Sequence, residues 1–372
     1  MSDCDLFSLA TKGVQSLSPY QAGKPIDELK REYGVSDVIK LASNENPLGL
    51  SANVISALKT ELIELSRYPD GNAFSLKDAL AKKHSVDIKQ ITVGNGSNDI
   101  LEILTRAFVT PEHEIIFSQH AFAVYPIVTQ AVGAKAVIVP AKNWGHDLDA
   151  MQKAITDKTR VIFIANPNNP TGTWLGKKEL STFLHAVPEN VLVVLDEAYF
   201  DFANNDSSAE DYPNGIEWIK SYSNLIVTRT FSKAYGLAGL RVGYSISHPD
   251  IADILNRVRQ PFNVNSLALR AAEVALDDVD YLESGLKLNS QGMSQLMTAF
   301  EKLNLSYILS IGNFICVNVG ANAMKVYDDL LYEGVIVRPV ANYEMPEYLR
   351  ITIGTEKENE RFIAALKKVL HK

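Results

Sequence analysis

The chain has 372 residues, of which 46% are apolar and 22% charged, and its formal net charge is −8. At about 100–200 residues per domain, this length predicts two domains that share one large core. The negative charge argues against a nucleic-acid partner, because a protein that binds the phosphate backbone normally carries a stripe of Lys and Arg. The lack of any run of about 18 apolar residues argues against a membrane span.

Other compositional features narrow the class of protein further. The start, MSDCDLFSLATKG, is acidic and lacks the pattern of a secretory signal, so we expect a cytoplasmic location. Cys4 and Cys316 lie far apart in the sequence, and we expect both thiols to be free in a reducing compartment. The seven His residues show no metal-ligand spacing, so we expect no metal site.

Taken in chain order, short strands alternate with helices. The segment ITVGNGSNDILEILTRAF begins as a strand at Ile91, turns at Gly94–Gly96 and continues as a helix. Strands also begin the segments EIIFSQHAF, KAVIVPA, RVIFIANPNNPTG, VLVVLDEAYF, NLIVTRTFSK and RVGYSIS. Several are apolar without alternation, which is typical of strands buried on both faces. The pattern predicts an α/β fold with a mainly parallel sheet flanked by helices.

The pattern of predicted strands and helices changes after Pro261. A helical stretch around 265–303 precedes NFICVNV, VIVRPV and YLRITIG, whose strand patterns alternate more and are separated by helices. We therefore predict a large domain at 44–262 and a small α+β domain at 263–372. The first residues carry little strand signal, so residues 1–43 are expected to form an arm that packs with the small domain.

Polar residues follow many of the predicted strands. Ligands of open α/β sheets bind outside the carboxyl ends of the strands, so these side chains should converge. With one aromatic included, the set is Gly96, Ser97, Asn98, Phe122, Asn169, Asp196, Tyr199, Thr230, Ser232 and Lys233. The Gly-rich turn of GNGSND suits a phosphate at a helix N-terminus, although such turns also cap helices for structural reasons alone.

Two ionisable residues in this set stand in unusual places. Lys233 follows a strand and precedes the Gly-rich YGLAGLRVGY, eight residues before Arg241. A lysine that attacks a carbonyl needs a depressed pKa, which burial or a nearby cation supplies. Asp196 ends the apolar run VLVVL, where a carboxylate is costly unless it is paired. Its partner is either a core cation or the protonated ring nitrogen of a cofactor.

Several motifs together resemble a known superfamily. LASNENPLG, GNGSND, NPNNPTG, LDEAYF and TRTFSKAYGLAGLRVGY are similar, in order and spacing, to the aspartate-aminotransferase-like (fold type I) pyridoxal-phosphate enzymes. Within that superfamily, SPYQAGKP, RYPDG, VIVRPV and YLRITIGT resemble histidinol-phosphate aminotransferases, although aromatic aminotransferases share several of these motifs. The resemblance covers nearly the whole chain and implies pyridoxal 5'-phosphate as the cofactor.

The resemblance also implies roles for the residues around the cofactor ring. Lys233 would bond covalently to the cofactor and then carry the proton, and Asp196 would pair with the pyridine nitrogen. Tyr199 and Asn169 would bind the ring oxygen. Phe122 stands where relatives often carry a stacking Tyr, so a role for a phenol hydroxyl is in doubt, and packing in the core is the alternative.

Further implied roles concern the two anionic ends of the ligands. The residues implied to hold the cofactor phosphate are Ser97, Asn98, Thr230, Ser232 and Arg241, with Tyr68 reaching it from the partner subunit of a homodimer with composite active sites. Arg350 and Arg338 would bind the anionic end of the substrate, assisted by Tyr20. The structural alternatives are that Tyr20 only packs and that Arg338 is a surface residue at a strand end. We expect Cys316 to be an inert buried residue.

The sequence therefore predicts an aminotransferase of histidine biosynthesis. It would interconvert L-histidinol phosphate and 2-oxoglutarate with imidazole acetol phosphate and L-glutamate, all small-molecule substrates. The open alternatives are an aromatic amino-acid aminotransferase and a lyase similar to threonine-phosphate decarboxylases. A regulatory cofactor-binding module is a further reading, but no helix-turn-helix or basic segment precedes the core to support it.

Overall fold

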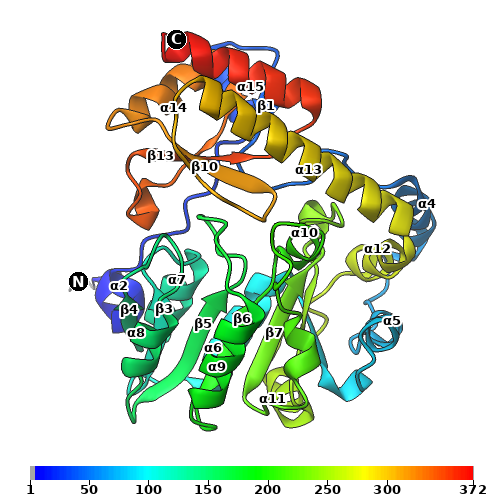
Figure 1. The fold of residues 1–372 in the computed structure, drawn as a ribbon. Coiled ribbons are helices and arrows are strands. Elements are labelled where there is room, and N and C mark those ends of the chain that lie inside the picture. Colours follow the sequence, from blue (N-terminus) through cyan, green and yellow to red (C-terminus); the bar gives the residue numbers. More distant parts are fainter. Residues whose placement is uncertain (1–4, 372) are drawn as a thin grey trace.

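The computed structural model describes residues 5–371, so Cys4 lies outside the described residues. A large seven-stranded sheet forms the centre of the lower part of the molecule in Figure 1, and a smaller four-stranded sheet lies in the upper part. The large sheet has, in spatial order, β2 (Ile91–Gly94), β8 (Gly243–Ile246), β7 (Leu225–Thr230), β6 (Leu192–Asp196), β5 (Thr159–Ala165), β3 (Glu114–Ser118) and β4 (Lys135–Val139). Strand β8 runs antiparallel to both of its neighbours, and the other pairs are parallel. The predicted α/β class with a mainly parallel sheet is confirmed.

Helices cover both faces of the large sheet. One face packs against α6 (Ser97–Phe108), α7 (Val124–Ala131) and α11 (Pro249–Val258). The opposite face packs against α4 (Ala52–Glu61), α5 (Phe74–His84), α8 (Leu148–Lys153), α9 (Lys177–Ala186) and α12 (Ser266–Asp277). Successive strand side chains point to opposite faces, so in β6 Val194 joins the first core cluster whereas Val193 and Leu195 join the second. Burial on both faces explains why these strands are apolar without alternation.

The upper part is built on the small sheet. Its strands are β12 (Arg338–Pro339), β13 (Tyr348–Thr352), β10 (Phe314–Asn318) and β9 (Tyr307–Ile308), and the helices packed with it are α13 (Val279–Lys302), α14 (Ala323–Tyr332) and α15 (Glu356–Val369). Two local expectations need correction. The single helical stretch predicted at 265–303 is two helices, because Asp278 adopts φ −85° and ψ 66° between α12 and α13. The segment VIVRPV forms two short strands, of which β11 (Val335–Ile336) pairs with β1 (Ile39–Lys40) and β12 joins the small sheet.

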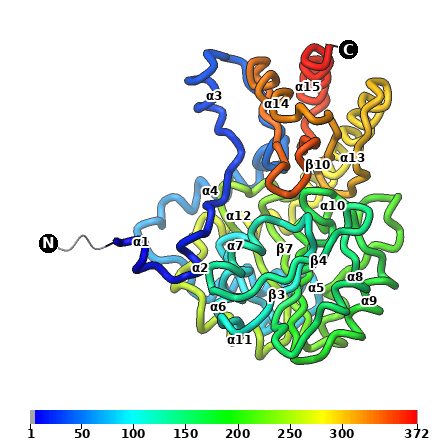
Figure 2. Tube along the Cα trace, turned by 90° about the vertical axis from the view of Figure 1, so that its left-hand side faces the viewer, coloured from blue at the N-terminus to red at the C-terminus, as the bar shows by residue number. Residues whose placement is uncertain are grey.

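The N-terminal segment contacts both parts of the molecule. It contains α1 (Leu6–Leu9), α2 (Lys12–Gln15) and α3 (Ile26–Tyr33), and in Figure 2 it runs from α1 and α2, beside the lower part, up to α3 in the upper part. Near α2, the amide of Gln130 on α7 donates a hydrogen bond to the Ser16 hydroxyl at 3.0 Å. Leu29 of α3 packs with Leu331 and Ile336 of the upper part. Packing of the whole arm with the small domain therefore stays a prediction.

The predicted boundary between the domains at residue 262 also stays a prediction. The buried alanines of α12, among them Ala268, Ala271 and Ala275, belong to the same core cluster as the large sheet. This packing favours a boundary near Asp278, where α12 ends and the long helix α13 begins.

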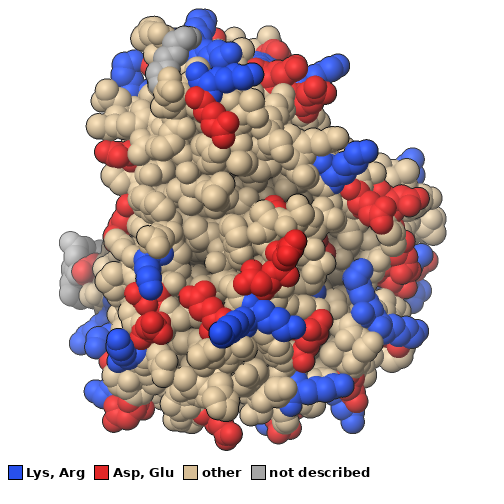
Figure 3. Space-filling view, viewed as in Figure 1, with Lys and Arg blue, Asp and Glu red and all other residues tan. Residues whose placement is uncertain are grey.

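The surface in the view of Figure 3 mixes charges of both signs. Lys and Arg lie among Asp and Glu, and a mostly uncharged band crosses the molecule between its upper and lower parts. Among the helices described between residues 5 and 371, we find none with the length and apolar character that crossing a membrane requires.

Candidate active site

One cavity of about 170 Å³ gathers almost all the residues singled out from the sequence. Its lining comes from the loops that follow strands of the large sheet, from β12 and β13 of the small sheet, and from the N-terminal segment. The predicted residues that line it are Tyr20, Ser97, Asn98, Phe122, Asn169, Asp196, Tyr199, Thr230, Ser232, Lys233, Arg241, Arg338 and Arg350. The convergence expected at the carboxyl ends of the strands is thus present in the structure.

Lys233 lies in the connection between β7 and β8. Its Nζ donates a hydrogen bond to the backbone carbonyl of Ser43 at 3.0 Å. Burial, followed by the nearby positive charge of Arg350, lowers the pKa of Lys233 to about 7. A substantial fraction of the amine is therefore neutral near pH 7, and a neutral amine is the nucleophilic form.

Asp196 ends β6 and is only 5% exposed. The Tyr125 hydroxyl donates to its Oδ2 at 2.9 Å, and the Thr228 hydroxyl donates to its Oδ1 at 3.1 Å. Burial raises the pKa of this carboxyl, and the two hydrogen bonds and the charge of Lys233 oppose that rise. The carboxylate is thus fixed in orientation, and a cation in the cavity would stabilise its charged form.

The two partners of Asp196 were missed by the sequence interpretation. Thr228 precedes Thr230 by two residues on β7, so both hydroxyls lie on the same face of the strand. That periodicity is a signal that the sequence contained. Tyr125 is fully buried on α7 and stacks on Phe163 of β5, with ring centroids 4.6 Å apart. Its contact with Asp196 depends on how α7 packs against the sheet, which no local pattern reveals.

Hydroxyl groups and one guanidinium converge at the N-terminus of α6. Ser97 begins this helix, and Arg241 Nη1 donates to the Ser232 hydroxyl at 3.2 Å. Gly96 has φ +84°, and a Cβ there would stand 2.5 Å from Arg241 Nη2, so a glycine is required for the guanidinium to lie against the turn. Backbone N–H groups, hydroxyls and a cation together form a cradle suited to a phosphate monoester.

The hydroxyl of Tyr199 is held by two amides. Asn44 Nδ2 donates to it at 2.8 Å and Asn169 Nδ2 donates to it at 3.1 Å. Asn44 is buried and had no assigned role, although it lies in the motif LASNENPLG. Phe122 lines the cavity and contacts the Tyr125 ring edge-on, at 5.9 Å between centroids. Its stacking on a cofactor ring stays a prediction.

Two buried arginines lie side by side at another part of the cavity. Arg338 and Arg350 are paired residues of β12 and β13, and they are 7% and 6% exposed. Arg350 donates to Asn169 Oδ1 and to the Ala42 carbonyl, and its buried Nε has no protein partner. The reading of Arg338 as a surface residue is wrong: it donates to the Gln21 carbonyl, and its guanidinium carbon lies 5.9 Å from the centre of the Tyr20 ring.

Three other residues lie apart from this constellation. Tyr68 does not line the cavity; it is 82% exposed and stacks on Phe262, with ring centroids 4.7 Å apart. The thiol of Cys316 is buried and donates to the Pro170 carbonyl at 3.0 Å, and burial raises its pKa to about 12, in keeping with an inert residue. His120 is buried with Nδ1 2.7 Å from the Tyr343 carbonyl oxygen. Within residues 5–371, no group of three or more His, Cys, Asp and Glu side chains is arranged to hold a metal ion.

The donor set fits the cofactor implied by the sequence resemblance. The cradle around Ser97 and Arg241 suits its phosphate, Asp196 suits a cationic ring nitrogen, and the buried amine of Lys233 suits its aldehyde. Arg350 has a buried Nε without a protein partner, and Gly96 leaves room for the guanidinium of Arg241, and both features suit the binding of anions. The fold and the site together suit a class of enzyme that binds an aldehyde cofactor beside a buried lysine.

Comparisons with known proteins narrow this class. Residues 36–366 match the family model of class I and II aminotransferases. The chain is 61% identical, over 98% of both chains, to histidinol-phosphate aminotransferase 2 of Pseudomonas fluorescens. It is 59% identical to histidinol-phosphate aminotransferase 1 of Idiomarina loihiensis, over 99% of this chain and 100% of that protein.

A comparison with solved structures also finds a histidinol-phosphate aminotransferase. The crystal structure of histidinol-phosphate aminotransferase from Sinorhizobium meliloti in complex with pyridoxal-5'-phosphate superposes with a TM-score of 0.89 at 28% identity, over 99% of both chains. The chain belongs to the class I and II aminotransferase family. The resemblance found in the sequence is confirmed.

Proposed function

We propose that this chain is a pyridoxal-phosphate-dependent aminotransferase that exchanges the amino group between L-histidinol phosphate and 2-oxoglutarate, in L-histidine biosynthesis. The observation that carries the proposal is the pair of buried arginines, Arg338 and Arg350, in the same cavity as Lys233. Full-length identity of about 60% to two histidinol-phosphate aminotransferases supports the same substrate.

The cofactor, when bound, supplies an aldehyde that accepts the amino group and a ring that withdraws electrons from the substrate carbon. The chain supplies position and charge. Asp196, fixed by Tyr125 and Thr228, holds a proton on the ring nitrogen, and Tyr199 with its two asparagines binds the ring oxygen. Ser97, Asn98, Thr230, Ser232 and Arg241 bind the phosphate, and Phe122 packs on the ring.

Lys233 is the group that moves the proton. With substrate and cofactor bound, its Nζ would take the proton from the substrate carbon and later give it back. A pKa of about 7 suits both halves of that transfer, because a general base works best near the operating pH. Arg338 and Arg350 hold the substrate by its phosphate in one half-reaction and by a carboxylate in the other, since the planar guanidinium pairs with either group.

An amine-donor screen tests the function. The loaded enzyme is incubated with 2-oxoglutarate and each of histidinol phosphate, phenylalanine, tyrosine and threonine phosphate, and L-glutamate is measured. We expect glutamate with the highest catalytic efficiency from histidinol phosphate. A preference for phenylalanine or tyrosine would indicate an aromatic aminotransferase, and loss of carbon dioxide from threonine phosphate without glutamate would indicate a lyase.

We further propose a cytoplasmic homodimer in which Tyr68 of each subunit reaches the other subunit's cavity. Several large apolar side chains in this part of the sequence are exposed in the single chain, namely Leu62, Ile63, Leu65, Tyr68 and Phe74, and Tyr68 stacks on the exposed Phe262. Exposed apolar groups favour a protein interface, and a two-fold axis would give each site the same donated residue.

Subunit mixing tests this arrangement. Lys233→Ala and Tyr68→Ala proteins are each expected to be weakly active, and mixed dimers should recover activity because one of their two sites carries neither change. Tyr332→Ala, which removes an exposed Tyr on α14, is the matched control and should behave as the wild type. A sedimentation profile showing an active monomer would refute the dimer.

A further inference from the structure

A buried ion pair joins the ends of β6 and β7 on the face of the large sheet that points away from the cavity. Glu197 follows Asp196 directly, and Arg229 stands between Thr228 and Thr230. Because side chains alternate along a strand, Asp196 and Thr228 lie on one face of the sheet, and Glu197 and Arg229 lie on the other. The side chains of Glu197 and Arg229 are 0% and 8% exposed, and their closest N–O distance is 2.6 Å.

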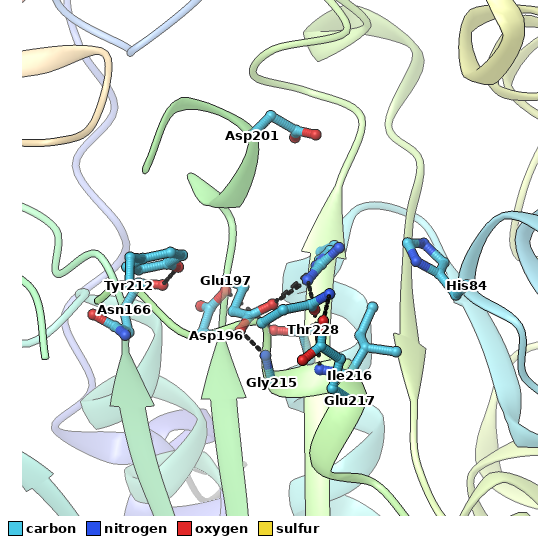
Figure 4. A network of polar contacts seen from close by, with 12 residues as sticks. His84, Asn166, Asp196, Glu197, Asp201, Tyr212, Gly215, Ile216, Glu217 and Thr228 are labelled. Atoms are coloured by element: carbon cyan, nitrogen blue, oxygen red, sulfur yellow. Dashed lines mark hydrogen bonds and ion pairs between the residues drawn. The ribbon is translucent and has the colours of Figure 1, made fainter. Parts of the chain in front are cut away.

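The hydrogen bonds of this pair hold both side chains in place. Arg229 Nε and Nη2 donate to Glu197 Oε2 at 2.9 and 2.6 Å, and Nη2 also donates to Asn214 Oδ1 at 2.7 Å. The backbone N–H of Gly215 donates to Glu197 Oε1 at 2.8 Å. The guanidinium carbon of Arg229 lies 3.4 Å from the centre of the Phe200 ring. Figure 4 shows this network around Glu197, next to Asp196.

The same layer continues to β5. The backbone N–H of Asn166, just after β5, donates to the Asp196 carbonyl at 2.9 Å, and the hydroxyl of Tyr212 donates to the Asn166 carbonyl at 2.5 Å. The N–H of Glu197 donates to the Thr228 carbonyl at 2.9 Å. The ends of β5, β6 and β7 are therefore connected at the level of Asp196 by backbone hydrogen bonds and by Tyr212, which does not line the cavity.

Stability alone is a weak explanation for such a pair. Removing two charges from water costs about as much as their attraction returns, so an apolar pair of similar volume serves the core as well or better. What an apolar pair cannot provide is a directional link between two strand ends. Here one of the linked strands, β6, carries Asp196. The other, β7, carries Thr228, which hydrogen bonds to Asp196, and Thr230 of the phosphate cradle.

We propose that Glu197 and Arg229 are a positioning pair, which holds Asp196 and β7 in the register that keeps the cofactor ring nitrogen protonated and its phosphate bound. Neither residue lines the cavity. The inference rests on the cofactor of the proposed function and is independent of which amine the enzyme uses.

Four variants test the pair. Glu197→Gln and Arg229→Met each break it, Glu197→Leu/Arg229→Met replaces it with apolar side chains, and Arg257→Met is the control. Arg257 pairs with Asp253 on the exposed side of α11, so its loss removes an ion pair without burial. Each protein is loaded with pyridoxal phosphate, and its visible absorption is titrated with pH in the absence of any amine. The cofactor dissociation constant, kcat and KM are then measured.

The expected result is a change in the cofactor spectrum. If Asp196 is displaced, it stabilises the positive charge on the ring nitrogen less. The titration follows a second nitrogen, the one that Lys233 would share with the cofactor, and a less positive ring raises the pKa of that nitrogen. The midpoint of the titration should therefore rise by at least about half a pH unit in the three pair variants, because nearby charges set such values. Their cofactor dissociation constants and kcat should worsen about tenfold, with an amine KM close to that of the wild type and of Arg257→Met.

The double variant decides the question if the single variants fail to fold, since it leaves no unpaired charge in the core. A folded double variant with the wild-type titration midpoint and cofactor dissociation constant would overturn the proposal. So would single variants that only lower the melting temperature. Because the titration contains no amine, a wild type that rejected histidinol phosphate would contradict the proposed function and leave this test intact.

Discussion

The cofactor end and the substrate end of the cavity are built in different ways. Lys233, Asp196 and Arg241 lie on or beside three neighbouring strands of the large sheet, which has an apolar core on each face. Arg338 and Arg350 belong to the small sheet, and Tyr20 to the N-terminal segment. The groups proposed to perform the chemistry are thus positioned by a single sheet. The groups proposed to hold the amine substrate come from separate elements, and Arg350 connects the two ends, because it donates to Asn169 and its charge lowers the pKa of Lys233.

The largest expected effect comes from the cofactor end. Lys233→Ala should abolish the visible absorption of the covalently held cofactor and lower turnover by several orders of magnitude, because one residue serves as both nucleophile and base. Absorption spectra and single-turnover assays measure both effects. Lys82→Ala, on the exposed side of α5, is the control and should be unchanged. A Lys233→Ala protein that stayed yellow and active would remove the basis of the site assignment.

Asp196→Asn should come next in size. The amide keeps the shape and still accepts the hydrogen bond from Tyr125, so the fold should survive. It carries no charge to stabilise a protonated ring nitrogen, and kcat should fall by well over tenfold, which corresponds to more than about 1.4 kcal/mol. A smaller loss in steady-state assays, with the melting temperature preserved, would reduce Asp196 to a structural carboxylate.

The pH dependence of cofactor loading tests the environment of Lys233. Burial and Arg350 lower its pKa to about 7, so protonation removes the nucleophile below that pH. The loading rate of the apoprotein should rise with pH through a midpoint near 7 and level off about one unit above it, and one unit below the midpoint it should be about tenfold slower than at the plateau. Stopped-flow absorbance at several pH values measures this. A midpoint near 10 would mean that Lys233 is solvated like an ordinary lysine.

At the substrate end, Arg338→Ala should change selectivity more than chemistry. A charge-assisted hydrogen bond is worth about 1.5–3 kcal/mol, so the ratio of kcat/KM for histidinol phosphate to that for phenylalanine should drop at least about tenfold. Using the ratio cancels general damage to the site. Equal losses for both amines would mean that Arg338 does not recognise the phosphate.

The smallest effect is expected from Tyr20→Phe. Tyr20 is half exposed and its ring lies beside Arg338. A single hydrogen bond contributes about 0.5–1.5 kcal/mol, which is a change of about twofold to tenfold in KM for the phosphate substrate. The control is Tyr332→Phe on the exposed side of α14. An unchanged KM would leave Tyr20 a packing residue only.

The same contrast explains what the sequence could predict. The ends of the strands can be predicted from the sequence, because a strand buried on both faces is a continuous apolar run. The first polar residue after such a run, such as Asp196, lies at the edge of the sheet where ligands bind. The fold class, the family and many of the residues that line the cavity followed from such runs and from the sequence motifs, although Asn44, which also lines the cavity, was not singled out.

What the sequence did not predict depends on contacts between distant segments. The hydrogen bond from Tyr125 to Asp196 and that from Asn44 to Tyr199 join residues 71 and 155 positions apart. The burial of Arg338 follows from the division of VIVRPV between two sheets. The roles of the individual side chains, and of Tyr68 in a second subunit, stay predictions until the variants are measured.

The antiparallel direction of β8 has a consequence for how the catalytic segment is encoded. Thr230 at the end of β7 pairs with Gly243 at the start of β8. The chain therefore reverses direction at the carboxyl end of β7, and Lys233 lies in the connection between the two strands. Had the next strand been parallel, a crossover would have carried the chain to the far edge before returning. The short connection between β7 and β8 therefore places Ser232, Lys233 and Arg241 in the lining of the same cavity. Residues close in the sequence therefore lie close in space, and the eleven-residue motif FSKAYGLAGLR contains three of the proposed anchoring residues, Ser232, Lys233 and Arg241.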